Sequence, residues 1–380
     1  MTWQDLILIP VFMDSIFWLM TTLCVAVFMR RKRVALAGRA PSSFTPYVSL
    51  IKPVYGLGKD LFVNLATACR QDYQDYEVIY AVQRKDDPAR EIVGKVREAY
   101  PQQNVHVVVD ESKIGSNGKV SNIYNASLRA HGEVFVFSDS DMFLEPDYLR
   151  KIVAPLADKR VGISCTLYSA WKPENILEAL ELLSYNINFV LSIVLAVVTK
   201  ASIACPGATM AVRRDVLDEI GGLVPLGNYF VEDYELGRRV VAKGYRIHFV
   251  SYVAKMSVDR RKFRDWWLHQ VYWDRNTKSA NPSGFFFTLF IRGIPFALLY
   301  AFLGASHGWS VLLGTIGVRL LTAVSNSLFL QDRDGIKGIW LLPLRDLLGI
   351  FVWLASFLKR YTYWKGKTFV LKKGKMVEVK

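Results

Sequence analysis

Two aspartates in the middle of the chain are spaced to share a cation. Asp139 and Asp141 follow the apolar run at residues 134–137, which is typical of a buried strand. Side chains two positions apart on an extended segment point to the same side, so both carboxylates can face one ion. Hard oxygen ligands suit Mg²⁺ or Mn²⁺, and either ion can bridge to a substrate diphosphate. The pair predicts a divalent-metal site, with a loop turn or a strand-end cap as the alternative.

Two further acidic pairs could act in catalysis or binding. Glu232 and Asp233 stand where a helix is expected to begin, in the sequence Tyr-Phe-Val-Glu-Asp-Tyr-Glu-Leu-Gly-Arg-Arg. A carboxylate at this place can serve as a general base, although acidic residues in a first helical turn also complement the helix dipole. Asp86 and Asp87 precede Pro88 after another apolar run, where a simple turn is the alternative to a binding role.

A polar loop containing glycine, at residues 113–122, precedes a helical pattern. Such a loop can place backbone amides and Lys119 near a phosphate. It differs from the P-loop pattern G-x-x-x-x-G-K-S/T, because Val120 follows the lysine. A second loop, Pro206-Gly207-Ala208, is expected to allow a close approach of the backbone to another group.

The segment at residues 260–278 interleaves aromatic and basic side chains. This pattern can bind single-stranded nucleic acid. Because an apolar segment of membrane type follows at once, an aromatic belt at the membrane interface is the preferred interpretation. No nucleic-acid partner is therefore expected.

These residues need a scaffold, and the apolar runs between them predict one. Short β-rich runs alternate with polar, helix-like stretches, and the runs cover residues 47–51, 76–82, 105–109, 134–138, 162–167 and 210–212. Alternation of this kind predicts an α/β domain over residues 47–280, with a largely parallel sheet and crossover helices.

The first apolar segment predicts a retained membrane anchor at residues 1–33. Residues 6–29 carry one charge, Asp14, and at about 1.5 Å per residue they can span the roughly 30 Å hydrocarbon layer. The basic residues 30–33 come after this run, whereas a cleaved signal peptide carries its charge before it. The positive-inside rule then places the linker at residues 34–46 and the α/β domain in the cytoplasm.

The C-terminal third is apolar again, over residues 281–358. Residues 285–305 and 309–330 are long enough to span. Residues 339–358 contain Pro343, Arg345 and Asp346, so a re-entrant or interfacial segment is expected there. The basic tail at residues 359–380 then stays cytoplasmic.

One more apolar segment, at residues 180–204, lies inside the α/β domain. A full crossing would carry the following chain to the wrong side of the membrane. We therefore expect a helix on the bilayer surface or along an acceptor groove, with a plain core helix as the alternative.

The bulk composition agrees with this mixture of parts. Of 380 residues, 52% are hydrophobic and 22% are charged, which excludes both a disordered chain and one made wholly of membrane helices. The net charge of +14 suggests nucleic acid, an anionic membrane surface or an anionic small substrate as a partner, and the average charge does not choose among them. The four cysteines form no C-x-x-C pair and the five histidines form no cluster, so neither a disulfide framework nor a structural zinc site is expected. Unpaired thiols suit a reducing compartment.

The order of the motifs along the chain is more specific than any one of them. The motifs follow one another in this order: Asp-Asp-Pro, the Lys119 loop, Asp-x-Asp, Pro-Gly, Glu-Asp-Tyr and the basic aromatic segment. This order resembles the ceramide glucosyltransferases and their bacterial relatives, including hopanoid-type lipid glycosyltransferases, which belong with the inverting, family-2-like GT-A glycosyltransferases. The stretch from Val48 to Gly56, and the stretch Tyr363-Trp-Lys-Gly-Lys367, are similar to that family as well.

The resemblance implies a role for each motif. Asp86 and Asp87 would contact the uracil–ribose end of a UDP-sugar, and Asp139 and Asp141 would hold the metal and the sugar diphosphate. Asp233 would be the base that deprotonates the acceptor hydroxyl. The other residues expected near the donor, the acceptor or the last motif are Lys119, Glu232, His269, Gln270, Tyr272, Trp273 and Arg275.

The last motif departs from the family pattern, which is Gln/Arg-x-x-Arg-Trp. Here the first and fourth positions are His269 and Tyr272, and Gln270 and Arg275 can compensate from nearby positions. The departure bears on diphosphate contacts and acceptor choice, and it argues against a processive polysaccharide synthase.

Taken together, the resemblance implies an integral membrane enzyme with a Rossmann-like GT-A domain. It would move glucose or GlcNAc from a UDP-sugar to a lipid hydroxyl such as that of ceramide, giving a β-glycolipid, in the inner membrane if the chain is bacterial. A hopanoid, a diacylglycerol or a polyprenyl phosphate remains open as the acceptor. A polysaccharide synthase, or a membrane-tethered scaffold or sugar-nucleotide sensor without activity, is less favoured.

Overall fold

We describe a computed structural model of the chain, covering residues 3–37, 44–203, 205–358, 361–364, 367–372 and 374–379. Gly38 and Pro41 of the expected linker lie outside the described residues, as do Lys359, Arg360, Lys365 and Lys373 of the expected basic tail. The chain divides into two compact units. The α/β unit comprises residues 32–169, 203–259 and 372–380, and the helical unit comprises residues 1–31, 170–202 and 260–371.

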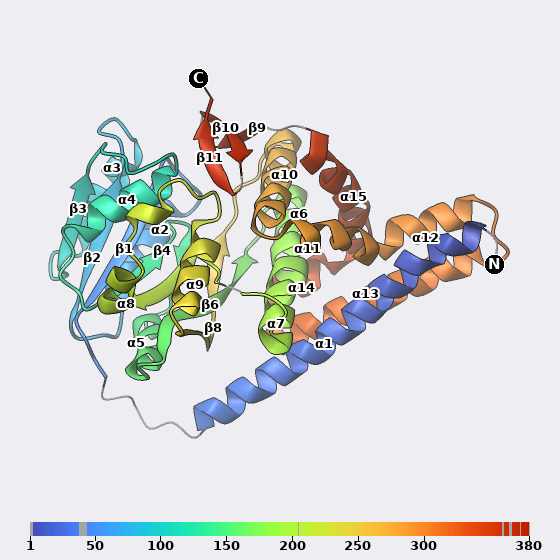
Figure 1. Cartoon of the computed structure of the whole chain (residues 1–380), viewed down its shortest axis with the longest axis horizontal. Coiled ribbons are helices and arrows are strands. Elements are labelled where there is room, and N and C mark those ends of the chain that lie inside the picture. The colour runs from blue at the N-terminus through green and yellow to red at the C-terminus, as the bar shows by residue number, and fades with distance from the viewer. Residues whose placement is uncertain are drawn as a thin grey trace. The chain divides into compact units, whose positions relative to one another are not determined.

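A mostly parallel sheet forms the centre of the α/β unit (Figure 1). Strands β1 (Val48–Val54), β2 (Tyr76–Val82), β3 (Val105–Val109) and β4 (Val134–Ser138) run parallel, in the order β3-β2-β1-β4. Every residue of β2 and β4 is buried, as expected for strands covered on both faces. The parallel sheet predicted from the alternating apolar runs is therefore confirmed.

The sheet continues beyond β4 with strands of mixed direction. In the described part of the chain its order is β3-β2-β1-β4-β7-β6-β8-β5, and β7 (Thr209–Arg213) is antiparallel to both β4 and β6 (Val161–Trp171). The short β5 (Met142–Phe143) pairs antiparallel with β8 (Arg246–Ser257). The sequence analysis did not predict β8, although its alternation of polar and apolar residues is typical of a half-buried strand.

Short helices connect these strands. They are α2 (Leu61–Ala66), α3 (Ala89–Ala99), α4 (Gly118–Ser127), α5 (Tyr148–Val153), α8 (Arg214–Glu219) and α9 (Glu232–Ala242). Helix α4 packs on β1 and β2, and α3 packs on β2 (Figure 1). Two of these helices matter for function, because α4 carries Lys119 in its first turn and α9 begins at Glu232.

The helical unit begins with α1 (Leu8–Ala37), preceded by a 3₁₀ turn at Trp3–Ile7. Next come α6 (Ile176–Ser184), a π-helical turn at Tyr185–Phe189, and α7 (Val190–Thr199). The remaining helices are α10 (Phe263–Ala280), α11 (Pro282–Phe287), α12 (Gly293–Phe302), α13 (Gly308–Leu330), α14 (Arg333–Gly338) and α15 (Leu342–Leu358). Strands β9 (Tyr361–Trp364) and β10 (Lys367–Lys372) form an antiparallel pair after them.

Several helices of this unit have the length and composition of membrane spans. The described residues contain four such helices: Gln4–Arg31, Ile176–Thr199, Gly308–Leu330 and Arg333–Leu358. The pair Pro282–Ile291 and Gly293–Phe302, bent by 44°, is a fifth if it counts as one span. The predicted N-terminal apolar segment is thus a helix long enough to span.

The re-entrant or interfacial segment expected at residues 339–358 stays a prediction. The structure shows no break at Pro343, since the helix Arg333–Leu358 continues through that residue. Pro343 is the second residue of α15, where a proline removes no helical hydrogen bond. The bend lies instead at Arg292, between the 3₁₀ turn Thr288–Ile291 and α12.

The helix Ile176–Thr199 interrupts the α/β unit, and sheet pairing bears on how it meets a membrane. Strand β6 precedes this helix and β7 follows it, and Ile163 of β6 pairs with Val212 of β7. A hydrogen-bonded sheet cannot be divided by a bilayer, because its exposed edges would lie unpaired in hydrocarbon. The pairing supports the prediction that this helix does not cross.

The end of the chain returns to the α/β unit. Strand β11 (Lys375–Glu378) forms a bridge between Lys375 and Tyr229. Phe230 N donates to Gly374 O at 2.9 Å, and Met376 N donates to Asn228 O at 2.7 Å. The described residues 374–378 of the expected basic tail are therefore bonded to the loop that leads into α9.

Candidate active site

The carboxyl ends of β1, β2 and β4 meet at one edge of the sheet because these strands are parallel. This edge is where open α/β sheets commonly bind ligands. Asp139 and Asp141 follow β4, and Asp86 and Asp87 follow β2. Glu232, at the start of α9, also lies in this region, because its carboxylate contacts Lys119. Three of the predicted acidic motifs are therefore found at the same edge.

Lys119 joins two of the predicted motifs. Its Nζ lies 2.8 Å from Asp139 Oδ1 and 3.2 Å from Glu232 Oε1. Burial would lower the pKa of Lys119, but Asp139 and Glu232 outweigh that effect and hold its pKa well above the ordinary value. The lysine is therefore a permanent cation at the point where a diphosphate is expected.

Asn117, which the sequence analysis did not single out, fixes the geometry of this cluster. Its side chain accepts hydrogen bonds from Lys119 N and Val120 N, capping α4. Its amide nitrogen donates to Tyr229 O at 2.9 Å and to Glu232 Oε2 at 3.2 Å. The asparagine before Gly-Lys was a possible signal, because Asn is a favoured N-cap residue.

A second lysine, Lys52 of β1, lies fully buried beneath the Asp-x-Asp pair. Its Nζ donates to Ser138 Oγ at 3.1 Å and to Met142 O at 3.2 Å. Burial lowers the pKa of Lys52 to about 8, while Asp141 and Asp139 act in the opposite direction. The sequence analysis missed this residue as a functional one, although a lysine inside the apolar strand Val48–Val54 is itself unusual.

Asp141 differs from Asp139 in its surroundings. Asp141 is exposed as a residue, yet neighbouring protein atoms desolvate its carboxyl, and the charge of Asp139 adds to this effect. Desolvation and then that charge raise the pKa of Asp141 to about 6. Two carboxylates that repel each other in this way are stabilised by a shared cation.

The Asp-x-Asp pair fits a divalent ion, although it does not form a complete cage. Asp139 retains 32% exposure of its side chain, so its oxygens can be reached. Among the residues that the structure describes, no group of three or more His, Cys, Asp or Glu side chains could hold a metal ion. An ion held by two carboxylates would complete its shell with substrate phosphate and water, which is how Mg²⁺ is commonly bound.

Asp233 has the environment expected of a general base. Its Oδ2 accepts a hydrogen bond from Gly207 N at 2.7 Å, and its Oδ1 accepts one from Tyr234 N at 2.7 Å. Burial, followed by the charge of Glu232, raises the pKa of Asp233 to about 7. A catalytic base is most effective when its pKa lies near the working pH.

Gly207 leaves no room for a side chain beside this carboxylate, which confirms the close approach predicted for its loop. A Cβ at this position would lie 2.6 Å from both Cβ and Oδ2 of Asp233. Gly207→Ala is expected to displace the carboxylate and to lower kcat by about 10- to 100-fold, since ångström-scale misplacement of a catalytic group has effects of this size. Steady-state kinetics together with donor titration would show a loss of kcat with little change in donor affinity.

Gly94→Ala is a matched control for that variant. Gly94 lies within α3, and a Cβ there would meet nothing within 4 Å. This change should leave kcat unaltered. Wild-type kcat in Gly207→Ala would contradict the view that this loop positions Asp233.

Asp87 and Asp86 behave differently from each other. Asp87 is buried, and its carboxylate accepts hydrogen bonds from Gly56 N at 3.0 and 3.1 Å and from Ala89 N at 2.9 Å. These bonds tie the end of β1 to the start of α3. Asp86 is exposed and forms an ion pair with Arg84. Contact of either residue with a nucleotide remains a prediction.

The last motif lies on α10, in the helical unit, where Glu181 of α6 contacts two of its side chains. His269 Nδ1 lies 2.5 Å from Glu181 Oε1, and Gln270 Nε2 donates to Glu181 Oε2 at 2.7 Å. The rings of His269 and Tyr272 are stacked, with centroids 6.1 Å apart. Glu181 is fully buried, and no local pattern in the sequence indicates this partnership.

Two other residues of this motif have clear partners in the helical unit. Trp273 Nε1 donates to His269 Nε2 at 3.2 Å, and its ring meets those of Tyr185 and Phe189 edge to face, each at 5.1 Å. Arg275 is buried and donates to the backbone oxygen of Tyr361. Arg275 therefore anchors the chain after α15, whereas a role for it in donor binding remains a prediction.

The mostly parallel sheet and the strand order that extends it give the chain the fold of the GT-A glycosyltransferases. The fold of a mannosyltransferase from Pyrobaculum calidifontis, solved with GDP-Man and Mn²⁺, is similar. Its TM-score is 0.53 at 17% identity, and the match covers 91% of this chain and 98% of that one.

The sequence comparisons are more specific. The profile of glycosyl transferase family 21 matches residues 14–377, so the chain belongs to that family and is a glycosyltransferase. It is 24% identical to ceramide glucosyltransferase 3 of Caenorhabditis elegans over 353 residues, which cover 87% of this chain and 74% of the relative. Ceramide glucosyltransferase 1 of the same organism is 25% identical over 209 residues, covering 54% of this chain and 44% of that protein. The family resemblance stated from the motifs is therefore confirmed.

Proposed function

We propose that the chain is an inverting glycosyltransferase that moves a hexose, glucose or GlcNAc, from a UDP-sugar to the hydroxyl of a membrane lipid such as ceramide. The product is a β-glycolipid. The observation that carries this proposal is the environment of Asp233, a carboxylate with a pKa near 7 held by two backbone amides. The names of the curated relatives support the lipid acceptor and the glucosyl group.

The reaction is a single displacement. Asp233 takes the proton from the lipid hydroxyl, and that oxygen attacks the anomeric carbon as the bond to the nucleotide diphosphate breaks. Lys119 offers a fixed positive charge to the departing diphosphate. Attack from the face opposite the leaving group converts an α-linked donor into a β-glycoside, and no second carboxylate nucleophile is needed.

Asp139 and Asp141 would hold a divalent cation, Mg²⁺ or Mn²⁺, together with the donor diphosphate. The bound ion would supply Lewis-acid neutralisation of the charge that grows on the leaving group. Lys52 is buried near this pair and supports it, since the charges of Asp141 and Asp139 act on its ammonium and its Nζ donates to Ser138, the residue before Asp139.

The membrane setting follows from the charges that flank the apolar helices. Arg30 and Arg31 end the first candidate span, and the positive-inside rule places the chain after them in the cytoplasm. The α/β unit is therefore cytoplasmic, where sugar nucleotides are made, and the enzyme is an integral membrane protein of the inner membrane if the chain is bacterial.

The test is product analysis in a host that lacks glycolipids but contains UDP-glucose, UDP-GlcNAc and ceramide. Expression of this chain should give a ceramide mass increased by one hexose or one N-acetylhexosamine, with a β-linkage by NMR. The Asp233→Asn variant, expressed at the same level, is the control and should give none. A glycosylated hopanoid, diacylglycerol or polyprenyl phosphate would show that this lipid, and not ceramide, is the acceptor. A free polysaccharide would overturn the assignment of a lipid acceptor.

A further inference from the structure

The end of the chain is fixed to one loop of the α/β unit. Of the four residues of β11, only Met376 is buried, with 3% exposure. Met376 N donates to Asn228 O at 2.7 Å, and Phe230 N donates to Gly374 O at 2.9 Å. Two backbone hydrogen bonds therefore join β11 to the loop at residues 227–230, which we call the bridging loop, and one buried side chain anchors the strand.

The bridging loop is also bonded to the loop that precedes α4. Asn117 N donates to Gly227 O at 2.8 Å, and the side-chain amide of Asn117 donates to Tyr229 O at 2.9 Å. Ser116 N donates to Asn228 Oδ1 at 2.9 Å. Asn228 thus accepts hydrogen bonds from two partners, one from the end of the chain at its backbone oxygen and one from the loop before α4 at its side chain.

The backbones of these two loops are in direct contact. A Cβ at Gly227 would lie 2.7 Å from Ile114 O, and a Cβ at Gly115 would lie closer still to Gly227 O. No side chain can be accommodated at such distances. Because closely packed groups transmit displacement to one another, a shift of the bridging loop must also move the loop before α4.

The loop before α4 leads directly to the charges of the candidate active site. Asn117 accepts a hydrogen bond from Lys119 N at 3.0 Å, and Lys119 Nζ lies 2.8 Å from Asp139 Oδ1. A continuous set of contacts therefore runs from Met376 to Lys119. Asn228 and Asn117 are its intermediate members, and all of these residues belong to the α/β unit.

We propose that Met376 and the strand β11 position Lys119 for the donor diphosphate. Met376 acts through the bridging loop and Asn117, so it is a positioning residue. Loss of β11 would free the bridging loop, and Asn117 would then hold the start of α4 less firmly. This inference rests on the proposed role of Lys119 towards the donor, and it goes beyond that role by giving the end of the chain a part in the reaction.

Met376→Asp in the full chain tests this inference, because an ionised carboxylate is costly to bury and should release β11. The affinity for UDP-glucose, measured by calorimetry, and kcat should each fall about tenfold, since a displaced active-site group has effects of this order. The acceptor KM should stay unchanged. Met376→Leu keeps an apolar side chain of similar volume and should retain the wild-type values. Val377→Asp is the matched control, since Val377 lies on the same strand and is 45% exposed.

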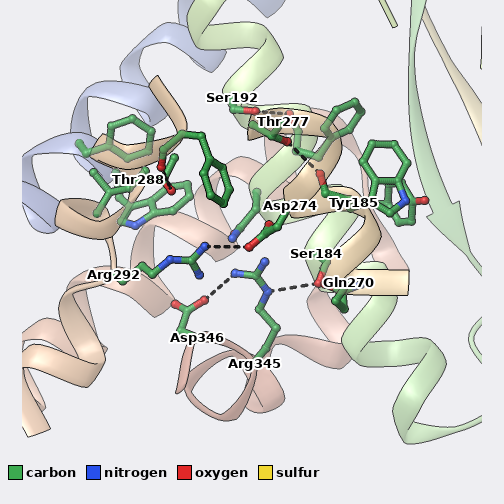
Figure 2. Close-up of a pocket in the computed structure, with 17 residues that line it drawn as sticks. Ser184, Tyr185, Ser192, Gln270, Asp274, Thr277, Thr288, Arg292, Arg345 and Asp346 are labelled. Atoms are coloured by element: carbon green, nitrogen blue, oxygen red, sulfur yellow. Dashed lines mark hydrogen bonds and ion pairs between the residues drawn. The ribbon is translucent and has the colours of Figure 1, made fainter. Parts of the chain in front are cut away.

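Hydrogen exchange of the full chain in nanodiscs gives a readout that does not depend on turnover. In Met376→Asp, residues 114–119 and 227–230 should exchange about tenfold faster, because lost hydrogen bonds make local opening easier. The pocket of the helical unit supplies an internal reference. Figure 2 shows Gln270, Asp274 and Thr277 of α10 in that pocket, and none of the described residues that line it belongs to β11 or to either loop. Exchange in α10 should therefore stay unchanged.

A double-mutant cycle with Asn117→Ala distinguishes positioning from a merely structural role. If Met376 acts through Asn117, the combined loss of donor affinity should be clearly smaller than the product of the two single losses. Independent losses would overturn the inference. Equal acceleration of exchange in α10, or wild-type donor affinity and kcat in Met376→Asp, would overturn it as well.

The outcomes also separate this inference from the proposed function. If the wild type glycosylates a lipid but Met376→Asp behaves as Val377→Asp does, the positioning role is wrong and the function stands. If Met376→Asp loosens both loops and weakens binding of UDP-glucose while the wild type glycosylates no lipid, the positioning role stands and the proposed acceptor class is wrong.

Discussion

Asp233→Asn is expected to lower the rate of sugar transfer by about 10²- to 10⁴-fold, the usual contribution of a positioned general base. The amide has nearly the same shape as the carboxylate but cannot take the acceptor proton. In the wild type, transfer should rise with pH through about 7, because the raised pKa of Asp233 leaves it protonated and inactive below that point. The residual activity of the variant should lack this rise.

The measurement is kcat/KM for the acceptor between pH 5 and 9, together with donor affinity by calorimetry. Donor affinity should survive in Asp233→Asn, because the residue is assigned to the acceptor proton. Asp218→Asn, an exposed aspartate on α8, is the matched control and should match the wild type. Near-normal transfer by Asp233→Asn would remove it as the base.

Removal of the divalent ion is expected to have the second large effect. Excess EDTA should lower transfer by about 10²-fold or more, since metal neutralisation of a leaving diphosphate is worth several kcal/mol. Asp139→Asn and Asp141→Asn should each weaken Mn²⁺-dependent binding of the UDP-sugar, because each removes a carboxylate ligand.

Binding of Mn²⁺ in the presence of UDP, followed by calorimetry or electron paramagnetic resonance, gives a readout that does not depend on activity. The variants should lose this binding, and Asp218→Asn should keep it. Full transfer in EDTA, or unchanged Mn²⁺ affinity in both variants, would remove the metal from this mechanism.

Local patterns predicted most of the α/β unit because its parallel strands are apolar runs that need no knowledge of their partners. The run at residues 76–82 became β2 with the predicted bounds. The acidic motifs could be placed at one edge by the same reasoning, since parallel strands end together. Strand β8 was not predicted because its polar and apolar residues are mixed and form no continuous apolar run.

The site residues that were not predicted owe their roles to partners that are distant in the sequence. Glu181 gains its role only when α10 packs beside it, and Asn117 only when the loop before α9 reaches it. Cys165 and Cys205 looked scattered, yet their sulfur atoms lie 3.8 Å apart. The bend between Ile291 and Gly293 was not predicted either.

The bonds between residues 374–376 and the loop at 228–230 also limit how the chain can pass through a membrane. The α/β unit lies before α10 and receives the chain again after α15, so a topology that keeps this unit on one side needs an even number of crossings between them. Three apolar segments lie between these points, and we infer that the bent pair at Arg292 is the one that enters and returns. If the candidate span at α1 also crosses, this topology has three crossings, and α1 begins on the side of the bilayer opposite to the α/β unit.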